Sequence, residues 1–125
     1  DDRLTVEDLI RLTMRTGEMA IEVMKKLDEA NTTIYQNPAP KKVNVHLKKG
    51  PFIIVSGHDL KDLEMLLKQT EGTGINIYTH GEMLPSHGYA GLKKYPHLIG
   101  NFGGAWQDQQ KEFDNLPGCI IMRLI

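Results

Sequence analysis

Residues 52–60 read FIIVSGHDL, and this short stretch decides the fold. Four apolar residues in a row, Phe52 to Val55, are typical of a strand that is buried on both faces of a parallel sheet. A small-residue turn follows, and Asp59 stands where a helix N-cap is expected. The stretch therefore predicts a strand, a sharp turn and a helix, which is the first half of a strand–helix–strand unit.

The same rhythm continues to the end of the chain. A helix over 60–70 has its leucines on one face, and Gly72 and Gly74 end it. Further strands are predicted over 75–79, 97–99 and 119–125, with helices over 86–95 and 105–115 between them. Such alternation predicts an α/β fold: a parallel sheet of about four strands with flanking helices, Rossmann-like and three-layered.

The first part of the chain has a different pattern. Thr5 is a suitable N-cap, and apolar residues then recur at spacings of three and four over 6–31. This pattern predicts one amphipathic helix, or two helices divided at Gly17. Pro38 and Pro40 break it, so 32–42 is predicted to be a linker. We expect a helical segment with its linker over 1–42 and a Rossmann-like domain over 43–125.

Composition restricts the possible partners. The 125 residues carry 15 Lys and Arg against 16 Asp and Glu, and this balance does not favour nucleic acid or a membrane surface. Cys119 is the only cysteine, which excludes an internal disulfide and favours a reducing, cytoplasmic setting. The chain begins with Asp1 and ends on the apolar Ile125, from which we expect a fragment of a longer protein.

Two polar side chains follow neighbouring predicted strands. His58 comes after the first strand, and Glu82 comes after the second, 24 residues later. Parallel strands end at the same edge of a sheet, where ligands collect, and neighbouring strands lie roughly 5 Å apart. An imidazole and a carboxylate suit a borderline or hard metal, or acid–base chemistry. A simpler interpretation is that such residues only precede a helix, and two ligands are few for a metal site.

Other candidate residues give weaker signals. His80 and His87 flank Glu82 and could orient a ligand there through hydrogen bonds, although loop histidines without a role are equally consistent with the sequence. The run 100–104 (GNFGG) could cradle a phosphate, but a tight turn explains it better. Trp106 is expected to be a packing anchor, and Cys119 a small buried hydrophobe at the opposite edge of the sheet.

Several long motifs in this chain are similar to those of one known family. They lie at 56–60 (SGHDL), 66–72 (LLKQTEG), 78–85 (YTHGEMLP), 93–98 (KKYPHL) and 103–113 (GGAWQDQQKEF). Together they resemble the hybrid cluster proteins, also called prismane proteins or hydroxylamine reductases. The similarity covers nearly all of 51–122.

The resemblance implies an iron–sulfur oxidoreductase that reduces hydroxylamine to ammonia, or nitric oxide, with electrons from a donor. It also implies that His58 and Glu82 are ligands of the family's hybrid iron–sulfur–oxygen cluster. The family's cubane cysteines are absent, and Arg123-Leu124-Ile125 stands where a cysteine ligand is expected. The isolated fragment is therefore expected to bind no cluster and to be inactive.

A second hypothesis needs no redox chemistry. The glycine-rich turns would also suit a non-enzymatic Rossmann-like module that binds a small anion or a partner protein. Surface that a longer parent would bury could also drive association into a homo-oligomer.

Overall fold

The computed structural model describes residues 4–123. The chain divides into two compact units, 1–34 and 35–125, so that the linker residues after Tyr35 belong with the second unit. The predicted domain boundary after residue 42 stays a prediction. No helix within residues 4–123 combines the length and the apolar character needed to cross a membrane.

The first unit is one uninterrupted helix, α1, which spans Val6–Tyr35 and ends on the first residue of the second unit. Thr5 caps it as predicted: its hydroxyl accepts from the backbone N–H of Asp8 at 3.1 Å, and the Asp8 carboxylate accepts from the Thr5 N–H at 3.1 Å. Gly17 does not divide the helix. The helix runs beyond residue 31 and ends where Gln36 adopts a φ of +69°.

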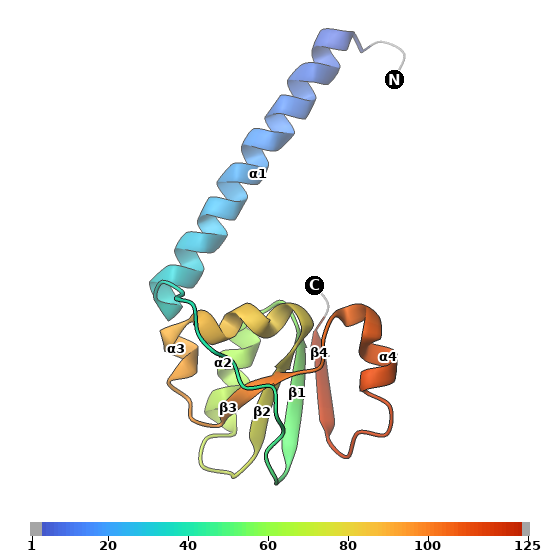
Figure 1. Cartoon of the computed structure of the whole chain (residues 1–125). Coiled ribbons are helices and arrows are strands. Elements are labelled where there is room, and N and C mark those ends of the chain that lie inside the picture. Colours follow the sequence, from blue (N-terminus) through green and yellow to red (C-terminus); the bar gives the residue numbers. More distant parts are fainter. Residues whose placement is uncertain (1–3, 124–125) are drawn as a thin grey trace. The chain divides into compact units, whose positions relative to one another are not determined.

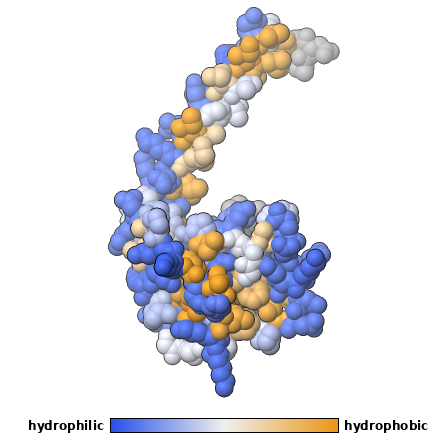
Figure 2. Space-filling model, in the orientation of Figure 1, coloured by the Kyte–Doolittle hydropathy of each residue, from blue (hydrophilic) through white to orange (hydrophobic). Residues whose placement is uncertain are grey.

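The large apolar residues of α1 are exposed from Val6 to Ile34, and only its last residue, Tyr35, is buried (Figure 2). A single helix has nothing of its own against which to bury such a surface. The exposed large apolar residues of this helix are Val6, Leu9, Ile10, Leu12, Met14, Met19, Ile21, Val23, Met24, Leu27 and Ile34.

The second unit confirms the predicted α/β fold. Its four strands are β1 (Phe52–Gly57), β2 (Asn76–His80), β3 (Leu98–Phe102) and β4 (Cys119–Arg123). All the pairings are parallel, in the order β3-β2-β1-β4 (Figure 1). The chain passes from β1 outward to β2 and β3, and then returns to place β4 on the other side of β1. The order therefore reverses between β1 and β4, which is where open α/β sheets bind ligands.

The first crossover helix is as predicted, and the later ones are shorter. Helix α2 spans Leu60–Gln69, and Asp59 caps it by accepting from the backbone N–H groups of Lys61 and Asp62. The helix predicted over 86–95 is instead a 3-10 helix, η1 (Gly81–Gly88), followed by one α-turn, α3 (Ala90–Lys93). Pro85 lies inside η1 and removes a backbone donor that a regular α-helix would use.

The predicted helix over 105–115 is also reduced to short pieces. They are η2 (Trp106–Asp108) and α4 (Gln109–Glu112). Soon after α4, Asn115 takes a φ of +54°, a left-handed conformation that helices cannot continue through. The predictions of regular helices in these two connections were wrong in type and length, although both connections do contain helical turns.

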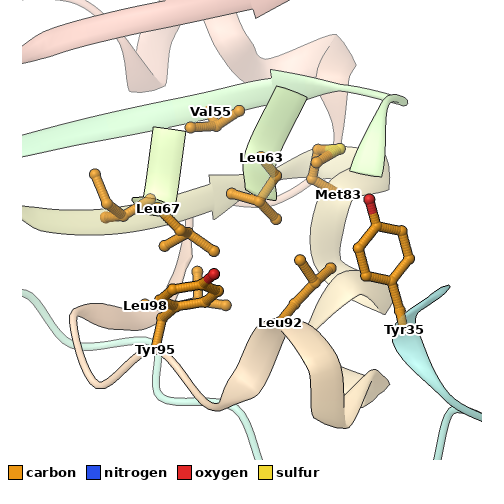
Figure 3. Packing of buried hydrophobic residues seen from close by; sticks show 9 residues of the cluster. Tyr35, Val55, Leu63, Leu67, Met83, Leu92, Tyr95 and Leu98 are labelled. Carbon is orange, nitrogen blue, oxygen red and sulfur yellow. The ribbon is translucent and has the colours of Figure 1, made fainter. Parts of the chain in front are cut away.

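The main hydrophobic core lies between the sheet and the α2–α3 side. Leu63 and Leu67 of α2 pack with Val55 of β1, and Leu92 of α3 packs against them (Figure 3). Leu63, Leu67 and Leu92 are fully buried. The other members of the cluster are Tyr35, Ile77, Met83, Tyr95 and Leu98. This core holds β1 and β2 in place and so sets the positions of the residues that follow them.

The outer edge of β3 is covered by residue 44. Asn44 forms a parallel bridge with Gly100, and its carbonyl accepts from the Asn101 N–H at 2.9 Å. A Cβ on Gly100 would lie 2.0 Å from that carbonyl oxygen, so only glycine allows this approach. Three of the five residues of the predicted GNFGG turn are therefore strand, and the turn itself begins at Gly103.

Cys119 differs from its prediction. It opens β4 and pairs with Ile53, so it does lie at the sheet edge opposite to His58 and Glu82. It is exposed, however, and the prediction of a buried residue was wrong. The reason is that β4 is an edge strand of the sheet as described over 4–123, with β1 on one side only.

Candidate functional site

His58 and Glu82 are placed at one edge of the sheet by the ends of β1 and β2. His58 directly follows β1, after Gly57, which has a φ of +137°. Glu82 is the second residue of η1, which begins where β2 ends. In the parallel register Ser56 lies opposite His80, so both strands run out at the same level. The strand order thus brings two side chains that are 24 residues apart to one place.

The two side chains contact each other. The distance from His58 Nε2 to Glu82 Oε2 is 2.5 Å, within the range of a strong hydrogen bond between charged groups. Both remain open to solvent, with 45% of the His58 side chain and 63% of the Glu82 side chain exposed. The two donor atoms therefore point into one accessible space. Their predicted role as cluster ligands stays a prediction.

A cavity of about 310 Å³ adjoins this pair. It lies at the carboxyl ends of β1 and β4, where the strand order reverses, the usual position for a ligand in this fold. Its volume is at the lower end of the range for small-molecule sites, about 300–1,000 Å³. The residues that line it are Ser56, Gly57, His58, Glu82, Trp106, Gln109 and Met122.

Trp106 belongs to this cavity and not to the core. It begins η2 and is 58% exposed, so the prediction of a packing anchor was wrong. An indole with a free face beside a His–Glu pair provides an apolar wall and one N–H donor. The sequence did not predict that Trp106 lines a cavity. Its pattern indicated a helix over 105–115, whereas the helix that carries Trp106 spans only Trp106–Asp108.

His80 forms a second His–Glu pair, in which the histidine is buried and 23% of the Glu112 side chain is exposed. Its side chain is fully buried, with Nε2 3.0 Å from Glu112 Oε2 and Nδ1 3.1 Å from Ser56 Oγ. The Phe113 ring packs against the imidazole, with 4.6 Å between the ring centroids. Ser56 and Glu112 were not predicted as site residues, because nothing in the sequence relates a glutamate to a histidine 32 residues before it.

Glu112 also determines the loop after β3. Its Oε1 accepts from the backbone N–H of Gly104 at 2.7 Å. Gly103 has a φ of +67°, and a Cβ there would lie 2.5 Å from Glu112 Oε2. A carboxylate thus occupies the space that a phosphate would need above this loop. The geometry disfavours the hypothesis that GNFGG cradles an anion.

His87 lies away from the His58–Glu82 pair. It is buried, its Nε2 is 2.9 Å from Thr79 Oγ1, and Thr79 donates to Asn101 Oδ1 at 2.9 Å. Burial, with a smaller effect of the Lys93 charge, lowers the pKa of His87 from 6.5 to about 4. It does not line the cavity. Its predicted role as a support for Glu82 stays a prediction. Within residues 4–123 its side chain has no hydrogen bond to His58 or Glu82.

The capacity for metal is limited to two donors. Within residues 4–123 no group of three or more His, Cys, Asp or Glu side chains is placed to hold an ion. His58 and Glu82 supply one nitrogen and one oxygen donor, which suit iron that is partly oxygen-bridged. The expected position of a further ligand, at Arg123-Leu124-Ile125, falls mostly outside the described residues. Any bound cluster would need ligands from beyond this pair.

Comparison with known proteins gives one consistent result. The profile of the Prismane/CO dehydrogenase family matches residues 2–124. A hydroxylamine reductase of Syntrophobacter fumaroxidans is 61% identical over 115 residues, which is 92% of this chain and 21% of that protein. A hydroxylamine reductase of Kosmotoga olearia is 58% identical over 122 residues, 98% of this chain and 22% of that protein. The chain thus spans about a fifth of the length of these curated relatives.

Proposed function

Because this chain belongs to the Prismane/CO dehydrogenase family, we propose that it is part of a hydroxylamine reductase and supplies two ligands to that enzyme's hybrid iron–sulfur–oxygen cluster. The ligands are His58 and Glu82. The observation that carries the proposal is their convergence: Nε2 and Oε2 meet at 2.5 Å beside a cavity at the reversal point of the sheet. Both side chains are open to solvent, so their donor atoms are accessible to a ligand.

The cluster, when bound, supplies the electrons that reduce the substrate. Conversion of hydroxylamine to ammonia and water consumes electrons and protons in equal number, so the whole protein requires an electron donor. The residues of this chain bind and shape the site. Trp106 and Met122 give the cavity apolar walls, which exclude water from a small substrate, and Gln109 adds a polar amide. We place the enzyme in the cytoplasm, in keeping with its single cysteine in these 125 residues.

Substitution of the two ligands in the full-length enzyme tests the proposal. We expect His58→Ala and Glu82→Gln each to lower the iron content and to change the spin-resonance spectrum of the cluster. Activity should fall by about 100-fold or more, because loss even of an outer-shell partner costs 10–100-fold. His46→Ala is a matched control, since His46 is exposed in a loop far along the chain from both strand ends. A normal cluster in both ligand variants would contradict the proposal.

The isolated chain should neither bind a stable cluster nor turn over. Its described residues offer only two clustered donors, fewer than iron–sulfur centres use. Anaerobic reconstitution with iron and sulfide, followed by optical spectra, measures this directly. A stable chromophore after gel filtration would show that the remaining ligands are not required.

The isolated chain should also associate with itself through α1. The exposed apolar residues of this helix exceed what a stable monomer usually shows. Sedimentation velocity over a concentration series should show species larger than 14.1 kDa. A single monomeric species at all concentrations would contradict this.

A further inference from the structure

A second concave surface lies between residues 38–45 and the 3-10 helix η1. Its volume is about 690 Å³, and its lining residues differ from those of the cavity beside His58 and Glu82. We call it the proline groove, because three of the residues that line it are prolines. Its exposed apolar walls include Pro38, Pro40, Val45, Leu84 and Pro85.

Backbone contacts hold the two sides of the proline groove together. The Ala39 N–H donates to the Gly88 carbonyl at 3.0 Å, and a Cβ on Gly88 would lie 3.3 Å from the Ala39 oxygen. Further along the same segment, Asn44 pairs with Gly100 of β3. The segment is thus fixed against η1 and against the edge of the sheet, so the groove is formed before anything enters it.

The base of the proline groove is polar. His87 lines it and is only 1% exposed, whereas the wall residues are open to solvent. The Nδ1 atom of His87 is buried and has no hydrogen-bond partner within residues 4–123. A buried polar atom without a partner is costly, and most such atoms in folded proteins have one. The unpaired nitrogen therefore indicates that a partner enters the groove.

The hydrogen bonds behind His87 decide where its proton lies. The amide nitrogen of Asn101 donates to the carbonyls of Phe102 and Gly103 at 3.4 and 3.3 Å, so Oδ1 of Asn101 faces Thr79. The Thr79 hydroxyl gives its single hydrogen to this oxygen at 2.9 Å. Thr79 Oγ1 must then accept from His87 Nε2, which is 2.9 Å away. The proton of His87 is therefore on Nε2.

The imidazole of His87 is neutral at pH 7. Burial, and to a smaller extent the Lys93 charge, lowers the pKa of His87 to about 4, although the Gly100 carbonyl acts in the opposite direction. Within residues 4–123 no carboxylate forms a hydrogen bond or ion pair with this ring. With its one proton on Nε2, the ring presents Nδ1 as a hydrogen-bond acceptor.

The groove therefore suits a flat apolar ring that carries one hydrogen-bond donor. Apolar walls and one well-placed polar group are typical of sites that orient a single molecule or side chain. Extended proline segments pack against aromatic rings, and the Lys41 ammonium beside the groove can be attracted to a ring face. The hydroxyl of tyrosine and the indole N–H of tryptophan usually find an acceptor when they are buried.

We propose that a tyrosine or tryptophan side chain from the rest of the full-length protein fills the proline groove and donates its O–H or N–H to His87 Nδ1. The proposal rests on the proposed function only in taking this chain as part of a longer enzyme. The chain covers 21% and 22% of two hydroxylamine reductases that it matches, so most of such an enzyme lies outside it and is available to cover the groove.

The acceptor role of His87 is measurable in the 125-residue chain with two matched probes. Fluorine NMR titrations compare 4-fluorophenol, which has one donor, with 4-fluoroanisole, which has the same ring and none. One hydrogen bond should make the phenol bind about 3- to 10-fold more tightly. In ¹⁵N-histidine protein the unprotonated Nδ1 signal of His87 should move to lower frequency as the phenol binds. Equal affinities for the two probes would overturn the acceptor role.

Two exposed positions on the same segment locate the binding. Val45 lines the proline groove and is 67% exposed, whereas Leu47 is 52% exposed and does not line it. A charge in the apolar wall opposes a ring, so Val45→Glu should weaken 4-fluorophenol binding by about 10-fold or more. Leu47→Glu is the matched control and should leave the affinity unchanged. Equal effects of the two substitutions would overturn the assignment of the phenol to the groove.

The full-length enzyme tests the occupant. If an aromatic side chain fills the groove there, 4-fluorophenol should bind about 10-fold or more weakly than it does to the 125-residue chain, because it must displace that side chain. Binding as tight as in the 125-residue chain, and lost in Val45→Glu, would overturn the occupant. These titrations need no cluster, so a failure of the ligand assignment to His58 and Glu82 would not alter them. A failure of the titrations would in turn leave that assignment untouched.

Discussion

The described residues contain two His–Glu pairs near the carboxyl ends of β1 and β2, and the two pairs differ in exposure and in hydrogen bonding. His58 and Glu82 lie just beyond the ends of β1 and β2, are about half exposed, and contact each other, with no further side-chain hydrogen bond within residues 4–123. His80 and Glu112 lie within the fold, with the histidine fully buried and both ends of the pair hydrogen-bonded. The first pair is open to solvent, whereas the histidine of the second pair is enclosed by the fold.

This difference teaches that residue type alone does not identify a ligand. Both pairs offer the same chemical groups, and both histidines follow buried apolar residues of a strand. Only position relative to the strand end separates them: His80 is the last residue of β2 and points into the fold, whereas His58 is one residue past β1. Substitutions in the two pairs should therefore lower the free energy of unfolding of the 125-residue chain by different amounts.

The largest expected loss of stability is that of His80→Ala. The substitution leaves Ser56 and Glu112 without their shared partner and opens a cavity, so we expect the free energy of unfolding to fall by about 3 to 4 kcal/mol. Urea denaturation measures it. His46→Ala, at an exposed loop position, should cost less than about 0.5 kcal/mol. Equal losses in the two variants would show that the buried pair does not support the fold.

A buried histidine without a carboxylate should respond to acid. The pKa of His87 is about 4 in the folded chain against 6.5 when unfolded, so the unfolded chain binds more protons between these values. The contribution of His87 to the free energy of unfolding is then fully present above pH 6.5. It falls as the pH drops towards 4, by up to about 3 kcal/mol. Urea denaturation at a series of pH values measures the slope.

The control for this slope is His87→Gln, which has no proton to gain in the same range. Its stability should be lower at pH 7 but should change less between pH 6.5 and 4 than that of the unaltered chain. An identical slope in both proteins would assign the acid sensitivity to other groups.

The next smaller effect concerns the glycine beside the buried pair. Gly103→Ala places a Cβ against the Glu112 carboxylate and strains a φ of +67°, so we expect a loss of about 2 to 3 kcal/mol. Gly72→Ala is matched in φ, at +74°, but has open space around it and should cost only about 1 kcal/mol. Thermal unfolding monitored by circular dichroism should separate the two variants. If Gly72→Ala lost as much stability as Gly103→Ala, the loss at Gly103 would come from its positive φ and not from the contact with the Glu112 carboxylate.

The smallest expected effect is that of the open pair. Because both side chains are largely exposed, Glu82→Gln in the isolated chain should change the free energy of unfolding by less than about 0.5 kcal/mol. The same substitution should abolish most activity in the full-length enzyme. A loss of several kcal/mol in the isolated chain would mean that this pair is structural, like the buried one.

Much of the fold could be predicted because local patterns carry it. The apolar run 52–55, the cap at Asp59 and the leucines of 60–70 are each legible in a short local pattern, and the structure confirms the strand, the cap and the helix. The connections 81–93 and 106–112 were predicted less well. The first contains Pro85, and a left-handed Asn115 follows the second, so neither continues as a regular helix.

The sequence by itself determined the parallel α/β fold and the meeting of His58 with Glu82, because parallel strands of similar length must end at one edge. Tertiary structure alone decided which side chains stand behind and around that pair. Ser56, His80 and Glu112 come from three separate elements, and Trp106 faces the cavity only because its helix is short. These contacts depend on how the connections between the strands pack on the sheet. The spacing of residues along the chain does not predict that packing.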